Sequence, residues 1–211
     1  MSFSRFSFPT LALACATVLP AANIYPLGQN STSGFVQGSA TGPAARGWDF
    51  VVNDPDVTVR ELGINPFLST NVTLTLWDTA AQSELAQVTI SATGGAWTFA
   101  SLLTPVSLTV GSTYSIIGWA NTSDSWYLYQ SGPPAGFAPT GTIQYVQTRF
   151  QNGSGANTFP TSLLPNYMYG VPDIGYTIGA STATPEPISM SLTGLGVVAL
   201  LTRRKIARKR G

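Results

Sequence analysis

Short apolar stretches of strand type, separated by turn residues, recur along the chain from Gly47 to Ile178. Gly, Pro, Asn and Asp interrupt these stretches, and none repeats its apolar residues at helical spacing over three turns. About ten such strands in a single region are typical of an antiparallel β-sandwich, jelly-roll-like in size, so we expect an all-β fold. The expected strands are 47–52, 57–64, 71–77, 85–90, 96–100, 105–110, 113–120, 125–130, 142–150 and 173–178.

Alternation within these stretches shows which side chains share a face of the sheet. In 71–77, every second residue is apolar, as expected for a strand with one buried face. In 57–64, Val59 and Leu62 have opposite parity, which predicts a β-bulge near Arg60 and Glu61.

The first residues of the chain have the pattern of a secretory signal peptide, which we place at 1–22. Arg5 gives a positive start, an apolar stretch follows at 8–19, and small residues lead to Ala22. We expect cleavage after Ala22, with cleavage after Ala16 as the alternative.

Cys15 is the only cysteine, and it lies within the predicted leader. A lipoprotein is the alternative interpretation of this residue. If the leader is removed, the mature protein has no thiol and no disulfide, so its apolar core alone must stabilise the fold. The following residues, 23–181, are long enough for one β-sandwich domain with a sizeable core.

The charge of the region between the two ends excludes several functions. Residues 23–184 hold three arginines against eight acidic residues, a net charge of −5, and they include neither Lys nor His. A basic surface for nucleic acid is therefore not expected. Imidazole is not available there as a general base or as a metal ligand.

The last residues, 182–211, combine three kinds of segment. Pro185 and Pro187 hold Glu186 in an extended, exposed stretch, because proline is excluded from helix interiors and central strands. An apolar stretch and a basic end follow, as in a membrane span held by the positive-inside rule. The basic residues are Arg203, Arg204, Lys205, Arg208, Lys209 and Arg210.

The predicted transmembrane helix covers about 188–202. Its apolar part, 188–201, forms about 21 Å of helix, against a hydrocarbon core of about 30 Å. Snorkelling by Arg203 and Arg204 or local thinning of the bilayer accommodates this difference. A buried amphipathic helix is the alternative, and the dense basic end at 203–210 argues against it.

Pro185, Glu186 and Pro187, the short apolar segment and the basic end together resemble the PEP-CTERM sorting signal. The resemblance implies export by a bacterium that makes extracellular polysaccharide. It also implies that an exosortase, a membrane cysteine protease, recognises and processes the tail near Pro185–Pro187. The apolar segment departs from the pattern in being short and in containing Ser, Thr and Gly.

A second resemblance covers the chain from Gly47 to about Ala120. Gly47-Trp-x-Phe, Val59-x-Glu-Leu-Gly and Leu74-x-Leu-Trp-Asp are similar to motifs of secreted bacterial β-sandwich domains of unknown function. Trp97-x-Phe continues the pattern. This resemblance implies a fold, and it implies no activity.

An aromatic cluster is the candidate carbohydrate site. Trp119, Trp126, Tyr127 and Tyr129 offer rings on which sugars stack, whereas core packing is the alternative role of aromatic strand residues. Trp126 has the opposite parity to Tyr127 and Tyr129, so we expect one of the two sets to be buried.

Acidic residues suggest two further kinds of site. Asp54 and Asp56 are candidate ligands of a structural calcium ion, with an ordinary Asn/Asp/Pro turn as the alternative. The candidate catalytic carboxylates, which no spacing places as a facing pair, are Asp49, Glu61, Asp78 and Asp173.

We therefore expect an exported, non-enzymatic β-sandwich at the cell surface or in the extracellular matrix, sorted through its tail. The expected partners are the export machinery, an exosortase and the membrane, with no nucleic acid and no cofactor apart from a structural calcium. The alternative is a carbohydrate-binding module of the matrix polysaccharide. A hydrolase is the third hypothesis, and it requires a cleft with two facing carboxylates.

Overall fold

The structure is a computed structural model that describes residues 21–27, 35–38, 42–121, 126–133, 137, 140–169 and 172–179. The predicted leader up to residue 20 lies outside these residues. So do the Pro185–Pro187 motif, the predicted span at 188–202 and the basic end at 203–210. Among the described residues, no helix has the length and apolar character needed to cross a membrane.

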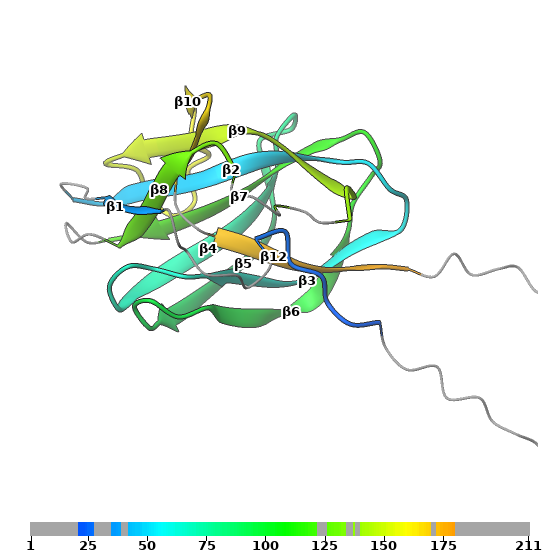
Figure 1. Cartoon of the computed structure of the whole chain (residues 1–211), viewed down its shortest axis with the longest axis horizontal. Helices are drawn as coiled ribbons and strands as arrows, with labels where there is room; N and C mark the ends of the chain where they lie inside the picture. The colour runs from blue at the N-terminus through cyan, green and yellow to red at the C-terminus, as the bar shows by residue number, and fades with distance from the viewer. Residues whose placement is uncertain are drawn as a thin grey trace, which may run out of the picture.

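Every regular element of the described chain is a β-strand (Figure 1). The strands are β1 (Val36–Gly38), β2 (Ala44–Val52), β3 (Val57–Ile64), β4 (Thr70–Asp78), β5 (Ser83–Ala92), β6 (Thr98–Ser107), β7 (Thr113–Ala120), β8 (Tyr127–Ser131), β9 (Ile143–Asn152), β10 (Ser162–Leu164), β11 (Tyr167–Tyr169) and β12 (Pro172–Ile178).

These strands form an antiparallel β-sandwich, as the sequence predicts. The large sheet has the order β10-β9-β2-β7-β4-β5, and two small sheets have the orders β12-β3-β6 and β1-β8-β11. Every strand pair is antiparallel. One continuous apolar core takes buried residues from all three sheets.

The inner face of the large sheet supplies much of this core. Trp48, Ile116 and Leu76 are cross-strand neighbours on β2, β7 and β4, and none of them is exposed. Each buried aliphatic side chain of this size contributes about 1.5–3 kcal/mol to folding. Because side chains alternate along a strand, the residues next to these three in each strand have their side chains on the outer face of the same sheet.

The predicted bulge is confirmed, because the β3–β6 register shifts between Val59 and Glu61. Two details differ from the sequence-based expectation. The sequence predicts separate strands at 96–100 and 105–110, whereas the single strand β6 covers the end of the first and the start of the second. Pro105 is tolerated because β6 is an edge strand. The stretch between β9 and β12, where the sequence predicts no strand, holds the short strands β10 and β11.

The first described residues are attached to the last strand. Ile24 and Tyr176 exchange two backbone hydrogen bonds, of 2.7 Å and 3.0 Å. The backbone N–H of Leu27 also donates to Asp173 Oδ2 at 3.1 Å. The two ends of the described chain therefore leave the sandwich on the same side, as Figure 1 shows.

Candidate functional site

The four aromatic residues predicted as a carbohydrate site do not form one surface. Trp126 is fully buried in the core and Tyr127 is nearly so. Trp119 lies on the outer face of the large sheet, where its Nε1–H donates to the Ser154 carbonyl at 2.5 Å. Tyr129 is half-buried on β8 and shares a face with Tyr127.

Tyr127 and Tyr129 instead belong to an aromatic face of the β1-β8-β11 sheet. Tyr129 pairs with Val36 on one side and with Tyr169 on the other. Tyr127 and Tyr167 have the same parity as these residues, so all five side chains lie on one face. We call this set the tyrosine surface: Val36, Tyr127, Tyr129, Tyr167 and Tyr169.

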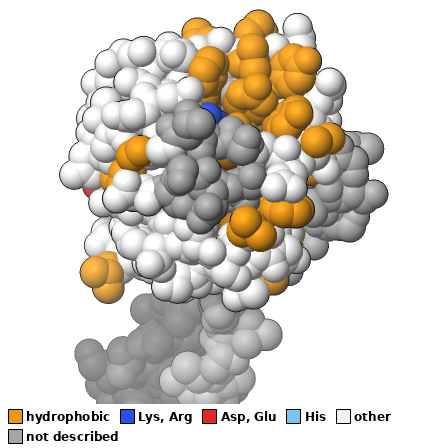
Figure 2. Space-filling view, turned by 90° about the vertical axis from the view of Figure 1, so that its left-hand side faces the viewer, with side chains coloured by type: hydrophobic (Ala, Val, Ile, Leu, Met, Phe, Trp, Pro, Cys, Tyr) orange, Lys and Arg blue, Asp and Glu red, His pale blue; other side chains and the backbone are white. Residues whose placement is uncertain are grey.

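The tyrosine surface runs from the interior to solvent. Tyr127 is 7% exposed, whereas Tyr167 is 38% and Val36 is 54% exposed. Tyr127 lies directly over Gly38, where an added Cβ would come within 2.0 Å of the ring. Figure 2 shows hydrophobic side chains gathered on this end of the molecule, with a small area of basic side chain beside them.

The rings of the surface pack against one another in tilted and edge-on pairs. Tyr169 packs against Tyr127 at 5.9 Å, against Tyr129 at 5.6 Å and against Tyr167 at 6.1 Å between ring centroids. Burial raises the pKa of the Tyr169 phenol, neighbouring phenols raise it further, and the nearby Arg46 acts in the opposite direction. The Tyr169 phenol therefore stays a neutral hydrogen-bonding group at physiological pH.

Arg46, on β2, lies beneath this surface and is 3% exposed. Its guanidinium carbon is 4.6 Å from the centre of the Tyr127 ring, 5.8 Å from that of Phe150 and 6.0 Å from that of Tyr169. These distances are within the range of cation–π attraction. Among the described residues, no carboxylate forms an ion pair with Arg46.

The outer face of the large sheet holds a different polar group, centred on Asp49. The Asp49 carboxylate accepts hydrogen bonds from Ser115 at 2.6 Å, from Arg149 Nε at 2.7 Å and from Gln147 at 2.8 Å. Arg149 also donates to the Pro160 carbonyl, and its guanidinium lies 4.5 Å from the Phe159 ring centre. Three donors therefore satisfy this buried carboxylate.

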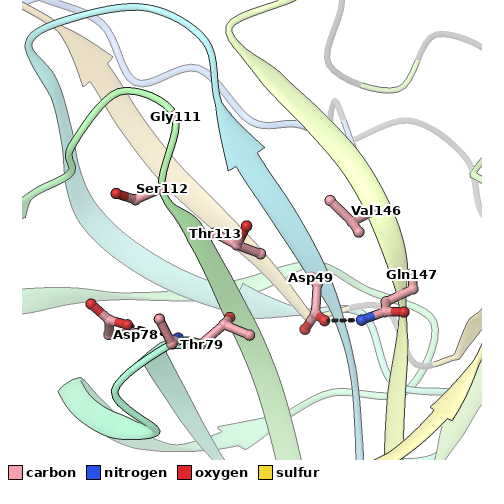
Figure 3. A pocket seen from close by; sticks show the side chains of 9 residues that line it. Asp49, Asp78, Thr79, Gly111, Ser112, Thr113, Val146 and Gln147 are labelled. Atoms are coloured by element: carbon pink, nitrogen blue, oxygen red, sulfur yellow. Dashed lines mark hydrogen bonds between the residues drawn. The ribbon is translucent and has the colours of Figure 1, made fainter.

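A pocket of about 480 Å³ opens beside this group (Figure 3). Gln147 points from β9 toward Asp49, and Thr113 lies between Asp49 and Asp78 in this view. The pocket is lined by Asp49, Asp78, Thr79, Ala80, Gly111, Ser112, Thr113, Val146 and Gln147.

The two carboxylates of this pocket are already engaged. Asp49 is fully buried and bonded to three donors, and Asp78 Oδ1 accepts from the backbone N–H groups of Ala80 and Ala81, both at 2.9 Å. Asp78 thus stabilises the β4–β5 turn, which is an ordinary role for Asp at a strand end. These contacts give both groups structural roles.

The other two candidate catalytic carboxylates lie elsewhere. Glu61 on β3 accepts from the Tyr25 hydroxyl at 2.9 Å. Asp173 on β12 is fully buried, and its oxygens accept from the backbone N–H groups of Leu27 and Ile174. Burial raises the pKa of the Asp173 carboxyl well above its ordinary value, although these two hydrogen bonds oppose the shift.

The candidate calcium residues lie in the turn between β2 and β3. Asp54 accepts from the Thr142 hydroxyl at 2.5 Å, and the Asp56 carbonyl accepts from the Gly179 N–H at 2.9 Å. Asp56 has φ +60°, which suits an Asx residue in a turn. Within the described part of the chain, no three side chains of Asp, Glu, His or Cys gather at a distance suited to a metal ion.

Comparison with protein-family models gives no match, and no curated protein is significantly similar to the chain.

Several residues of the tyrosine surface were not candidates in the sequence. Tyr167 and Tyr169 lie between 150 and 173, where the sequence predicts no strand, and Arg46, which lies beneath the surface, precedes the predicted strand at 47–52. The Tyr-x-Tyr spacing at 167–169 is the one local signal, because it places both rings on one face of a strand. Their proximity to Arg46 depends on long-range pairing.

Proposed function

We propose that this protein is an exported, non-enzymatic β-sandwich that is delivered to the cell surface or the extracellular matrix through its C-terminal tail. In this proposal, residues 1–22 are a signal peptide and residues about 188–202 form a transmembrane helix. The export machinery and an exosortase are its partners, and the tail is processed near Pro185–Pro187.

The position of the last strand carries this proposal. β12 ends at Ile178, and Gly179 is exposed, so the Pro185–Pro187 motif follows the last strand of the sandwich in the chain. Ile24 is paired with Tyr176, so the two ends of the described sandwich lie on the same side. Cleavage near both ends therefore leaves every strand pair of the sandwich intact.

Intact mass and cell fractionation of the native protein test this proposal. We expect wild-type protein to lose the residues that follow Pro187 and to leave the inner membrane. A Glu186→Ala/Pro187→Ala variant should keep its full length there, because the processing enzyme no longer recognises the tail. Glu84→Ala changes an exposed glutamate of β5 and should behave like wild type.

If wild type and the tail variant both keep Arg203 to Gly211 and fractionate alike, processing by an exosortase is contradicted. The tail would then be a plain membrane anchor.

Carbohydrate binding is the second candidate function, and the tyrosine surface is the observation that favours it. Tyr129, Tyr167 and Tyr169 make no hydrogen bond through their phenol hydroxyls to another described residue. Each therefore offers an apolar ring together with a free hydroxyl, the two groups that a sugar ring binds. This site differs from the predicted one in that Trp119 and Trp126 are not part of it.

A further inference from the structure

We propose that the tyrosine surface binds an anionic polysaccharide, for which the buried Arg46 supplies the positive charge. This inference rests on the carbohydrate-binding function proposed above, and it specifies the class of sugar polymer. A chain of uronic acid residues combines the two features that this surface fits, which are sugar rings and a regular series of carboxylates.

Among the described residues, no carboxylate balances the charge of Arg46. Nη1 donates to the carbonyls of Ala45 at 2.7 Å and Gln151 at 3.2 Å, and Nη2 donates to Asn152 Oδ1 at 2.7 Å. All three acceptors are neutral, and Nε, although buried, has no hydrogen-bond partner. A buried guanidinium ordinarily has a carboxylate partner, so Arg46 retains a capacity for an anion.

The aromatic rings that separate Arg46 from solvent allow its charge to act at the tyrosine surface. Tyr127, Tyr169 and Phe150 surround the guanidinium and exclude water from it. An unpaired charge in such a low-dielectric setting is screened less than an exposed one. No Asp or Glu belongs to the tyrosine surface, so it presents no carboxylate of its own to oppose the field.

The phenols favour a sugar polymer as the ligand. Aromatic rings at Tyr129, Tyr167 and Tyr169 can stack on the apolar faces of sugar rings. Their hydroxyls can donate hydrogen bonds to sugar hydroxyls or to carboxylates. The 38% exposure of Tyr167 gives a ligand access from the solvent side, and the more buried rings connect it to Arg46.

The first test compares two polymers that differ only in charge. Polygalacturonate and its carboxyl-reduced, neutral form have the same backbone, and the full-length purified protein is titrated with each by calorimetry. We expect binding to polygalacturonate to be about tenfold tighter or more, because one favourable charge interaction of about 1.4 kcal/mol has that effect. This preference should fall as salt rises from about 50 mM to about 500 mM.

Two variants assign the effect to the surface. Arg46→Gln should remove the preference for the acidic polymer while leaving weak binding to both polymers. Arg60→Gln, at an exposed arginine of β3, should change neither the preference nor the affinity for either polymer. Tyr167→Ala should weaken binding to both polymers, whereas Leu103→Ala, at a fully exposed residue of β6, should not. Tyr167→Ala keeps the test valid if Arg46→Gln fails to fold.

The possible contrary results are distinct. Equal affinity for both polymers, weakened by Tyr167→Ala, would overturn the role of Arg46 and keep the carbohydrate-binding function. Failure to bind either polymer would overturn both the role of Arg46 and the carbohydrate-binding function. Equal binding of polygalacturonate and a single-stranded DNA of similar charge, unaffected by Tyr167→Ala, would show a nonspecific polyanion effect and overturn the site. None of these results bears on the processing of the tail.

Discussion

Arg46 and Arg149 lie on adjacent strands of the large sheet, on its two opposite faces, and both are buried. Arg149 forms an ion pair with Asp49 and lies over Phe159. Arg46 lies over Tyr127 and donates only to neutral oxygens. The two side chains thus have the same charge and similar burial, and they differ in whether a carboxylate accompanies them.

Because of this difference, the charge of Arg149 has a structural role, whereas we propose that the charge of Arg46 serves a ligand. The Asp49–Arg149 pair satisfies its own charges and connects β2 to β9 and to the Pro160 backbone. Such a pair holds the outer face together, and breaking it leaves a lone buried charge. Arg46 has no such partner among the described residues, so an anion at the tyrosine surface would complete its environment.

Removal of the carboxylate from the balanced pair should have the largest effect on stability. Asp49→Asn leaves Arg149 without its counter-ion, and we expect the free energy of unfolding to fall by about 3–5 kcal/mol. Urea denaturation measures this change. The double variant Asp49→Asn/Arg149→Met should recover part of the loss, and a single-variant loss below about 1 kcal/mol would contradict the structural role.

Asp173 is the acidic counterpart of Arg46, because it is buried and no described residue of opposite charge pairs with it. Its folded-state pKa is raised above the unfolded value, so the folded state keeps the proton more firmly. The stabilisation from that proton is complete below about pH 3.8 and is lost as pH rises through the folded pKa.

We therefore expect the free energy of unfolding to fall as pH rises above about 4, by at most about 1.4 kcal/mol per pH unit from this group. Asp173→Asn should remove that part of the slope, as measured by urea denaturation at several pH values. Parallel pH profiles of wild type and variant would show that Asp173 does not titrate as described.

The position of Tyr127 over Gly38 can be tested by a single methyl group. In Gly38→Ala, the added Cβ meets the Tyr127 ring, and we expect a loss of about 1–3 kcal/mol from overpacking. Gly155→Ala, whose nearest neighbour would be 3.9 Å away, is the matched control and should be nearly neutral. Equal thermal stability of the two variants would contradict the close packing that shields Arg46.

Replacement of the unbalanced arginine should cost less than breaking the pair. Arg46→Met removes three hydrogen bonds and the contacts with the rings, but it also removes a buried charge that no described carboxylate balances. We expect a loss of about 1 kcal/mol. A loss as large as that of Asp49→Asn, in the same urea titration, would show that Arg46 is mainly structural.

The smallest effect on stability is expected at the exposed edge of the tyrosine surface. Tyr167→Ala should change the free energy of unfolding by less than about 0.5 kcal/mol, because an exposed side chain contributes little to packing. A loss above about 2 kcal/mol in a thermal melt would place Tyr167 in the core instead.

The sequence predicts local features of this fold well, because they depend on alternation within single strands. The bulge of β3 near Glu61 follows from residue parity, and the predicted bounds of β3 are those of the structure. Parity does not separate Trp126 from Tyr127, because both side chains are buried. The fold class also follows, since strand-type stretches with frequent turns have few other stable arrangements.

Features that depend on long-range pairing were not predictable in this way. β10 and β11 are three-residue strands whose pairing partners, β9 and β8, supply the sheet that they join. The role of Trp119 also differs, because residues near Ser154 and Phe159 cover the outer face where its indole lies. The contact between Arg46 and Tyr169 likewise joins segments more than a hundred residues apart in sequence.

The most direct test of the proposed delivery to the matrix is the intact mass of the protein recovered from the extracellular polysaccharide of its native host. We predict a species that lacks both the leader and the residues after the Pro185–Pro187 motif, recovered with the polysaccharide. Recovery only from the membrane fraction, with Arg203 to Gly211 still attached, would contradict it.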